Sequence, residues 1–351
     1  METFITGIQQ VGIGVSDAET AKYLYRDLFG MNILLFEDTA SATLMTRYTG
    51  NEVHRRKAIL SINLNGGGGL ELWQFLSRKP SYCATAPEPG DLGIFAVKIK
   101  TADLSSAHGN FLQNDTVKTS PVLLTPDSKE HFWVEDSLGN LFDIINSNCW
   151  FNSKSTTCGG VTGVVIGVSE MERSMKFYKE ILGIDEIIYD HTGIMQDGPA
   201  FQEKSKTFRR VLLRKNKSVT GAFGHLLGSV EIELVERLDK ATRKIFGDRL
   251  WGDCGFIHLC FDVTYMDKLK DRASKGGYSF TVDSAGSFEM GEAAGRFCYV
   301  EDPDGTLIEL VETHKIPVIK KLGLYVNLKK RKSEKALPRW MLNLLALNKI
   351  R

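Results

Sequence analysis

Short stretches of alternating apolar and polar residues, separated by amphipathic segments, run along most of the chain. This is the pattern of a mixed α and β fold. One segment occurs twice, as GVSDAETAKYLYRDLFGM from Gly14 and as GVSEMERSMKFYKEILGI from Gly167. Each copy predicts an apolar strand that runs into a helix, and the helix ends at a glycine, Gly30 or Gly183. The chain is therefore predicted to be internally duplicated.

The two predicted helices begin with matching signals. Ser16 and Glu19 have the Ser-x-x-Glu spacing of a capping box, and so do Ser169 and Glu172. In a capping box the two side chains satisfy backbone amides at the start of the helix. We therefore expect the serines to be the N-caps.

A second repeat closes each half of the chain. WVEDSLGNLFDI begins at Trp133, and YVEDPDGTLIEL begins at Tyr299. In each copy a turn-forming pair separates two apolar strands, so both copies predict hairpins, and we interpret the acidic residues around the turns as structural. Between the two repeats each half contains a glycine-rich turn into a strand and a new strand-to-helix start. Each half is therefore predicted to hold two βαβββ modules, giving an α+β fold with four modules.

Length and composition agree with two domains of ordinary size. The 351 residues are 42% hydrophobic with a formal net charge of +1, so each half can bury a core and no general attraction to nucleic acid is predicted. We place the first domain at residues 1–150 and the second at residues 158–314. The tail at residues 315–351 is basic, with 11 Lys and Arg residues and one acid. We expect its leucines and Trp340 to strap it over a domain.

Cysteine usage and hydropathy bear on the compartment. The six cysteines form no Cys-x-x-Cys pair and are too sparse for a disulfide framework. No apolar run is long enough to span a membrane, and the N-terminal sequence does not resemble a signal peptide. We predict a cytoplasmic protein, a monomer or homodimer without stable membrane insertion.

Four polar residues occupy strand positions that face apolar or glycine-rich surfaces. Alternation places Gln10 on the glycine-lined face of the first strand. Glu71 shares its face with two aromatic residues, and His258 lies on the face opposite Ile257. Glu309 lies in a strand that is apolar on both faces, where an unpaired charge is costly.

The chemistry of these residues indicates a metal site. A single histidine or glutamate in a strand is more often structural than a ligand. These four, however, hold corresponding module positions and offer one amide, one imidazole and two carboxylates. Such a donor set suits a six-coordinate divalent cation with water in the open positions. The predicted metal ligands are therefore Gln10, Glu71, His258 and Glu309.

These modules resemble the vicinal oxygen chelate superfamily, which includes glyoxalase I, extradiol dioxygenases, methylmalonyl-CoA epimerase and bleomycin- or fosfomycin-resistance proteins. The resemblance covers residues 5 to 313 and rests on the doubled modules, the Y-[RK]-[DE]-x-x-G helix end and the V-E-D-x-x-G-x-x-x-[DE] hairpin. It implies two glyoxalase-like domains with curled mixed sheets, in which the first and last strands of the modules supply metal ligands. These motifs are specific for fold and poor for activity.

The resemblance also implies how the ligands are shared among the modules. Neither half holds a complete set, but pairing module one with module four, as tandem members do, completes one. Pairing modules two and three leaves a pseudo-site that serves structure. One metal site per chain is therefore expected, built across the two halves. The ligand positions are Gln10 and Glu71 in module one, Ala96 and Asp143 in module two, Gly163 and Glu233 in module three, and His258 and Glu309 in module four.

A Gln/Glu/His/Glu set is the ligand pattern of one branch of glyoxalase I. It implies that a divalent metal (Zn, Ni, Mn, Fe or Co) polarises a carbonyl oxygen while Glu309 or Glu71 moves a proton between adjacent carbons. The arginines that anchor glutathione in that enzyme are replaced here by Gly14 and Cys254. We therefore expect a small substrate that is not a glutathione adduct, and no further cofactor.

Three functions are compatible with the sequence. Two of them are enzymes and the third is not, so the sequence leaves open whether the protein is an enzyme. The favoured one is a metal-dependent lyase or isomerase. An extradiol-type dioxygenase is the second, although Gly163 stands where a histidine of its two-His, one-carboxylate triad belongs. The third is a non-catalytic binding or resistance-type protein that holds a small molecule in an apolar cup.

Overall fold

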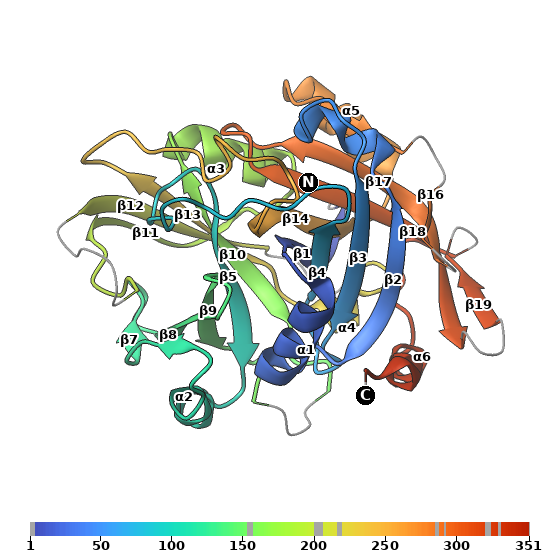
Figure 1. The fold of residues 1–351 in the computed structure, drawn as a ribbon, viewed down its shortest axis with the longest axis horizontal. Coiled ribbons are helices and arrows are strands. Elements are labelled where there is room, and N and C mark those ends of the chain that lie inside the picture. The colour runs from blue at the N-terminus through green and yellow to red at the C-terminus, as the bar shows by residue number, and fades with distance from the viewer. Residues whose placement is uncertain are drawn as a thin grey trace.

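The computed structural model describes residues 4–152, 157–199, 206–215, 220–284, 288–290, 293–319, 324–328 and 331–350. Two curled mixed sheets lie side by side, and helices pack against them (Figure 1). The predicted α+β fold with two curled mixed sheets is confirmed.

The first sheet combines strands from both ends of the chain. Its order is β15-β17-β18-β14-β1-β4-β3-β2, with β16 paired to β17 and β19 paired to β18. At its centre β1 pairs antiparallel with β14 and parallel with β4, and β14 pairs parallel with β18. The strands are β1 (Ile5–Gly14), β2 (Ile33–Ser41), β3 (Arg55–Ile62), β4 (Gly69–Phe75), β14 (Gly255–Val263), β15 (Phe280–Asp283), β16 (Phe288–Met290), β17 (Ala293–Glu301), β18 (Leu307–Ile319) and β19 (Leu324–Asn327).

The second sheet takes its strands from the middle of the chain. Its order is β11-β12-β13-β10-β5-β9-β8-β6, with β7 paired to β8. At its centre β10 pairs antiparallel with β5 and parallel with β13. The strands are β5 (Gly93–Thr101), β6 (Lys118–Thr119), β7 (Leu123–Leu124), β8 (Glu130–Glu135), β9 (Leu141–Asn146), β10 (Val161–Val168), β11 (Glu186–Ile194), β12 (Thr207–Arg214) and β13 (Glu231–Arg237).

Each sheet therefore joins one module from each half of the chain. Modules one and four build the first sheet, and modules two and three build the second. The strand β18 continues past residue 314 into the basic tail. The domain boundaries at residues 150, 158 and 314 stay predictions.

The helices and the strands beneath them form one large apolar cluster. It includes Val11 of β1, Val164 of β10, Phe29 of α1 and Phe177 of α3. Residues from both sheets thus share a single core, which holds the sheets together. The helices are α1 (Ala18–Phe29), α2 (Leu104–Leu112), α3 (Met171–Glu180), α4 (Gly224–Leu227), α5 (Met266–Lys275) and α6 (Arg339–Asn343), with the 3-10 turns η1 (Thr43–Tyr48) and η3 (Leu344–Asn348).

The predicted capping boxes are wrong. The N-cap of α1 is Asp17, whose carboxylate accepts hydrogen bonds from the backbone N–H groups of Glu19 and Thr20. The N-cap of α3 is Glu170, which makes no side-chain capping bond. An aspartate caps as well as a serine, so a helix start one residue later was equally compatible with the sequence.

The acidic residues of the two hairpins make structural contacts, in agreement with their interpretation. Asp136 accepts a hydrogen bond from the buried Tyr25 hydroxyl at 2.7 Å. At the equivalent place in the other half, Asp302 accepts one from Tyr178 at 3.1 Å. Both aspartates also accept backbone N–H groups of their own turns. The duplication therefore extends to these tyrosine–aspartate pairs.

The C-terminal segment packs against the edge of the first sheet, where the chain ends beside α6 (Figure 1). Leu337 and Leu342 are buried in an apolar cluster with Ile33 of β2 and Leu226 of α4. Trp340 is 63% exposed. The leucines therefore anchor this segment as expected, but Trp340 does not.

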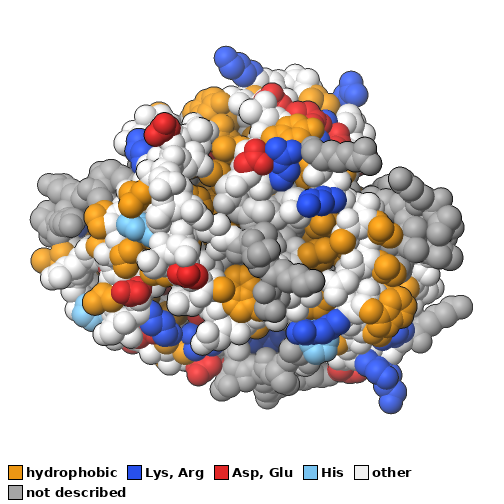
Figure 2. All heavy atoms as spheres, turned by 90° about the horizontal axis from the view of Figure 1, so that it is seen from below, with side chains coloured by type: hydrophobic (Ala, Val, Ile, Leu, Met, Phe, Trp, Pro, Cys, Tyr) orange, Lys and Arg blue, Asp and Glu red, His pale blue; other side chains and the backbone are white. Residues whose placement is uncertain are grey.

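Neither sign of charge dominates the described part of the face in Figure 2, where acidic and basic side chains are interspersed. Among the described residues, every helix is too short or too polar to traverse a lipid bilayer.

Candidate metal centre

Four adjacent strands of the first sheet bring the predicted ligands together. The order β18-β14-β1-β4 places Glu309, His258, Gln10 and Glu71 on consecutive strands. The register aligns Gly12 of β1 with both His258 and Glu71, and it aligns Glu309 with the residue two positions after His258. Because residues two apart point to the same face of a strand, all four side chains project into the concave side of this sheet.

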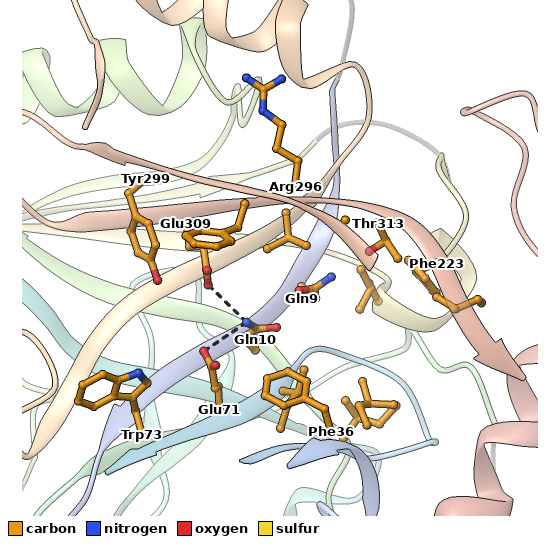
Figure 3. Close-up of a pocket in the computed structure, with 18 of the residues that line it drawn as sticks. Gln9, Gln10, Phe36, Glu71, Trp73, Phe223, Arg296, Tyr299, Glu309 and Thr313 are labelled. Carbon is orange, nitrogen blue, oxygen red and sulfur yellow. Dashed lines mark hydrogen bonds between the residues drawn. The ribbon is translucent and has the colours of Figure 1, made fainter. Parts of the chain in front are cut away.

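The distances among these groups are short. The Nε2 atom of His258 lies 3.2 Å from Oε2 of Glu71 and 3.2 Å from Oε2 of Glu309. The amide Nε2 of Gln10 lies 3.4 Å from the same two oxygens. Figure 3 shows Gln10 between the two carboxylates. Within the described residues, Glu71, His258 and Glu309 are the group of acidic and imidazole ligands close enough together to hold one ion.

Two buried atoms in this cluster have no hydrogen-bond partner. They are Oε1 of Gln10 and Nε2 of His258. A half-turn of the Gln10 amide, which exchanges its nitrogen and oxygen, would direct Oε1 at the two carboxylates. The cluster would then present an amide oxygen, an imidazole nitrogen and two carboxylate oxygens to a common point. This donor set fits a divalent cation.

The electrostatics of the cluster also favour a cation. Burial raises the pKa of Glu309; nearby His258 opposes this rise, and the like charge of Glu71 adds to it. Burial would lower the pKa of His258, but Glu309 and Glu71 raise it overall. Two buried carboxylates repel each other and lack the solvation of water. A positive charge between them would relieve both costs.

Aromatic side chains enclose the histidine. The rings of Trp251 and His258 are stacked with centroids 6.0 Å apart, and Tyr299 lies edge-on at 5.7 Å with its hydroxyl 3.5 Å from Nδ1. Trp73 packs edge-on against Trp251. The expectation that Ile257 lies on the face opposite His258 is wrong. A register shift between β1 and β14 turns Ile257 into the same apolar cluster as Trp73 and Tyr299.

A cavity of about 350 Å³ opens from this cluster. Gln10, Glu71 and Glu309 lie in its wall together with Trp73 and Tyr299. Further along, the cavity is lined by apolar residues of β2, β3, α4, β18 and the C-terminal segment. The candidate ligands therefore face a space large enough for a small organic molecule.

The second sheet holds cationic side chains where the first has its cluster. Lys98 of β5 places Nζ 2.7 Å from Asp143 and 2.9 Å from Glu233. Arg210 also contacts Glu233, at 2.6 Å, and pairs with Asp197. The positions Ala96 and Gly163 offer no ligand atom, as expected. A protein ammonium and a guanidinium thus balance the buried carboxylates of this pseudo-site.

Gly14 has no room for any side chain. A Cβ atom at this position would lie 1.9 Å from the backbone oxygen of Asp253. Cys254, the other position at which the resemblance predicts an anchoring arginine, is buried. The backbone itself therefore excludes an arginine at position 14.

Comparisons with known proteins agree with this architecture. Residues 160–310 match the family described as "Glyoxalase/Bleomycin resistance protein/Dioxygenase superfamily". Among solved structures, glyoxalase I from Zea mays is similar with a TM-score of 0.53 and 15% identity over 87% of this chain and 92% of that one. A variant of the same maize enzyme has a TM-score of 0.56 and 14% identity, over 87% of this chain and 93% of that one. No curated protein matches this chain.

These findings confirm the resemblance to the vicinal oxygen chelate superfamily. The family model covers the second half directly, and at these low identities the structural likeness shows the fold alone. The buried Glu71, His258 and Glu309 cluster is able to hold a metal ion. That these residues and Gln10 do bind one stays a prediction.

Sequence reasoning missed residues around the site. Lys98 was not recognised, although a lysine in an apolar strand such as GIFAVKIKT is a visible signal. The pairing of Arg210 with Glu233 was not expected either. Tyr299 and Trp251 were also missed. The part of the cavity wall formed by α6 and η3 had no recognisable signal, because it depends on where the C-terminal segment docks.

Proposed function

We propose that the protein is a metal-dependent lyase or isomerase that moves a proton between carbons next to a carbonyl group of a small substrate. The observation that supports this proposal most is the convergence of Gln10, Glu71, His258 and Glu309 at one end of an apolar cavity. This is the ligand pattern of one branch of glyoxalase I, with which the chain shares its fold.

The residues would divide the work as follows. All four would hold the metal, which, when bound, supplies polarisation of a carbonyl or enediolate oxygen. Glu71 and Glu309 lie on opposite sides of Gln10, so each carboxylate can reach a substrate held between them. One would take a proton from a carbon and return it to the neighbouring carbon. Trp73 and Tyr299 would exclude water from this exchange.

The other two functions have less support. A dioxygenase of the extradiol type uses two histidines and one carboxylate, whereas this cluster, within the described residues, holds one histidine. A binding protein would need the cavity but no proton-transfer groups. The two carboxylates at the end of the cavity therefore favour the enzyme.

The partner and compartment belong to the same proposal. The substrate is a small molecule, and the chain acts as a monomer or homodimer without nucleic acid. None of the six cysteines, all of which are among the described residues, takes part in a disulfide, which is usual in a reducing compartment such as the cytoplasm.

Metal content and turnover test the proposal together. The wild-type protein should retain about one divalent ion per chain and should turn over a member of a panel of 2-oxo aldehydes, epimerisable acyl thioesters and catechols. His258→Ala, Glu71→Ala and Glu309→Ala should each lose the ion and the activity.

Glu312→Ala is the matched control, because Glu312 is on the same strand as Glu309 and its carboxylate accepts the N–H of Met266 instead. It should keep both properties. Equal metal content in all variants, with folding checked by circular dichroism, would exclude this site. Metal binding without turnover of any class would favour the binding protein.

A further inference from the structure

The cavity beside the candidate metal centre is polar at one end and apolar over the rest of its wall. Apart from the ligand cluster, its described lining is dominated by aliphatic and aromatic side chains. Phe36 of β2 and Phe223 beside α4 represent this region in Figure 3. A molecule that fills the cavity would therefore bury mostly apolar surface beyond its reacting group.

The basic side chains in this lining are already paired. Among the described lining residues they are Arg56 and Arg296. Arg56 donates to the carboxylate of Asp38 at 2.9 Å and to its backbone oxygen at 3.1 Å. Arg296 makes a two-pronged contact with Asp283, at 2.9 and 2.7 Å, and a third bond to Asp267. Figure 3 shows its guanidinium directed away from Gln10 and Glu309.

An anionic group on a substrate would therefore find no uncommitted cation in the described wall. Burying a carboxylate without a partner costs several kcal/mol, and taking Arg56 or Arg296 would break an existing ion pair. The same wall also contains two carboxylates of the ligand cluster, which would repel a second anion. The charge pattern thus selects against acidic substrates.

From these observations we propose that the substrate carries an uncharged, apolar body, and that the C-terminal segment 339–348 is part of the site that selects it. This inference rests on the proposed function, since it names the substrate class of the same site. Its physical basis, the apolar wall, is independent of whether a metal binds.

The C-terminal segment contributes directly to this wall. Met341, Leu342 and Leu345 line the cavity, and Leu342 is buried. Leu347, two residues further on, is 65% exposed and is absent from the described lining. Leu345 therefore faces the cavity while Leu347 faces solvent, which provides a matched pair of positions for a test.

Binding of simple ketones measures the apolar preference. Methyl alkyl ketones, from methyl ethyl ketone to methyl heptyl ketone, would be titrated by calorimetry into metal-free and zinc-loaded protein. Affinity should rise by about threefold to fourfold for each added methylene until the cavity is full. An affinity independent of chain length in both forms would overturn the proposal.

A charged analogue measures the exclusion of anions. The keto acid that carries a carboxylate in place of the terminal methyl of methyl hexyl ketone should bind at least about tenfold more weakly than the ketone. Equal or tighter binding would mean that an arginine receives the anion, and the proposal would be wrong.

Two substitutions test the C-terminal segment. Leu345→Glu should weaken binding of methyl hexyl ketone by at least about tenfold, because it places a charge in the apolar wall. Leu347→Glu adds the same charge to the same segment at an exposed position and should change binding less than about twofold. If Leu345→Glu disturbs folding, Leu345→Ala should still weaken binding by about fivefold or more. Equal effects of the Leu345 and Leu347 variants on ketone binding would show that the C-terminal segment is not part of the site.

The two proposals fail separately. Chain-length dependence in a protein that binds no metal would leave the apolar preference intact and overturn the proposed function. A metal-loaded, active protein that binds long and short ketones equally would leave the proposed function intact and overturn the apolar preference.

Discussion

Gly12 lies directly opposite His258 across the β1–β14 pair, and the imidazole occupies the space that a side chain at position 12 would need. A Cβ atom on Gly12 would lie 2.4 Å from Cε1 of the ring. The ring is also enclosed by Trp251 and Tyr299, so it has little freedom to move aside. The glycine therefore helps to set the orientation of the candidate ligand.

Gly12→Ala should displace the His258 ring and reduce metal affinity by at least about tenfold, as loss of a ligand's support commonly does. Titration of the metal-free protein with zinc measures this. Gly109→Ala is the control, because a Cβ there meets nothing within 4 Å, and it should leave the affinity unchanged. Unchanged affinity in Gly12→Ala would show that the ring can settle elsewhere without loss.

The hemithioacetal of methylglyoxal and glutathione should be a poor substrate. The backbone oxygen of Asp253 excludes an arginine at position 14, and Cys254 offers no charge for the carboxylates of the tripeptide. A standard spectrophotometric assay of lactoylglutathione formation, with maize glyoxalase I as positive control, checks this. Rapid turnover would mean that other basic residues hold glutathione.

Lys98→Met should destabilise the protein by about 3 to 5 kcal/mol, because it leaves the buried Asp143 and Glu233 without their shared ammonium. Lys118→Met removes a lysine of the same sheet whose side chain is 72% exposed, and its effect should be below about 1 kcal/mol. Urea unfolding of both variants measures the difference. A Lys98 variant as stable as wild type would show that the pseudo-site does not need its cation.

The pseudo-site also predicts a dependence of stability on pH. Burial alone would lower the pKa of His131, but its pairing with Asp143 and Asp197 raises it to about 9 from an ordinary 6.5. The folded protein then keeps a proton that the unfolded chain releases, so this contribution is complete below pH 6.5 and is lost as the pH rises through 9.

Comparison with His131→Gln isolates this contribution. The difference in unfolding free energy between wild type and variant should be greatest below pH 6.5. It should shrink as the pH rises from 6.5 through 9. Groups that do not contact His131 cancel in the difference. Against the effect of burial, Lys98, His131 and Arg210 hold the pKa values of Asp143 and Asp197 below their ordinary range, so the titration of these two carboxyls lies on the acid side of this window. A difference in unfolding free energy that stays constant between pH 6.5 and 9 would show that His131 is neutral in the folded state.

Much of the architecture and of the candidate site could be predicted from the sequence. Local repeats revealed the modules, and strand alternation correctly placed Glu71 on the same face as Trp73. Alternation failed at Ile257, because a register shift depends on the partner strand. The N-cap Asp17 was missed because several polar residues precede the helix.

Long-range relationships account for the remaining differences. Lys98 and Arg210 meet Glu233 from different strands of a sheet built across both halves, and no local pattern encodes that meeting. The docking of Leu345 at the cavity is likewise set by packing between distant segments. Predictions from pattern are therefore strongest within one module and weakest where modules or the C-terminal segment meet.

The pairing of β1 with β14 determines when the centre can first exist during translation. During translation β1 and β4 leave the ribosome long before β14 and β18 have been synthesised. Gln10 and Glu71 therefore cannot assemble into the centre until His258 and Glu309 are present. Until then the edge of β1 that β14 will cover stays open to other strands, and such late, non-local pairing slows folding. A polypeptide truncated after the first half would therefore have an exposed strand edge and two of the four ligands.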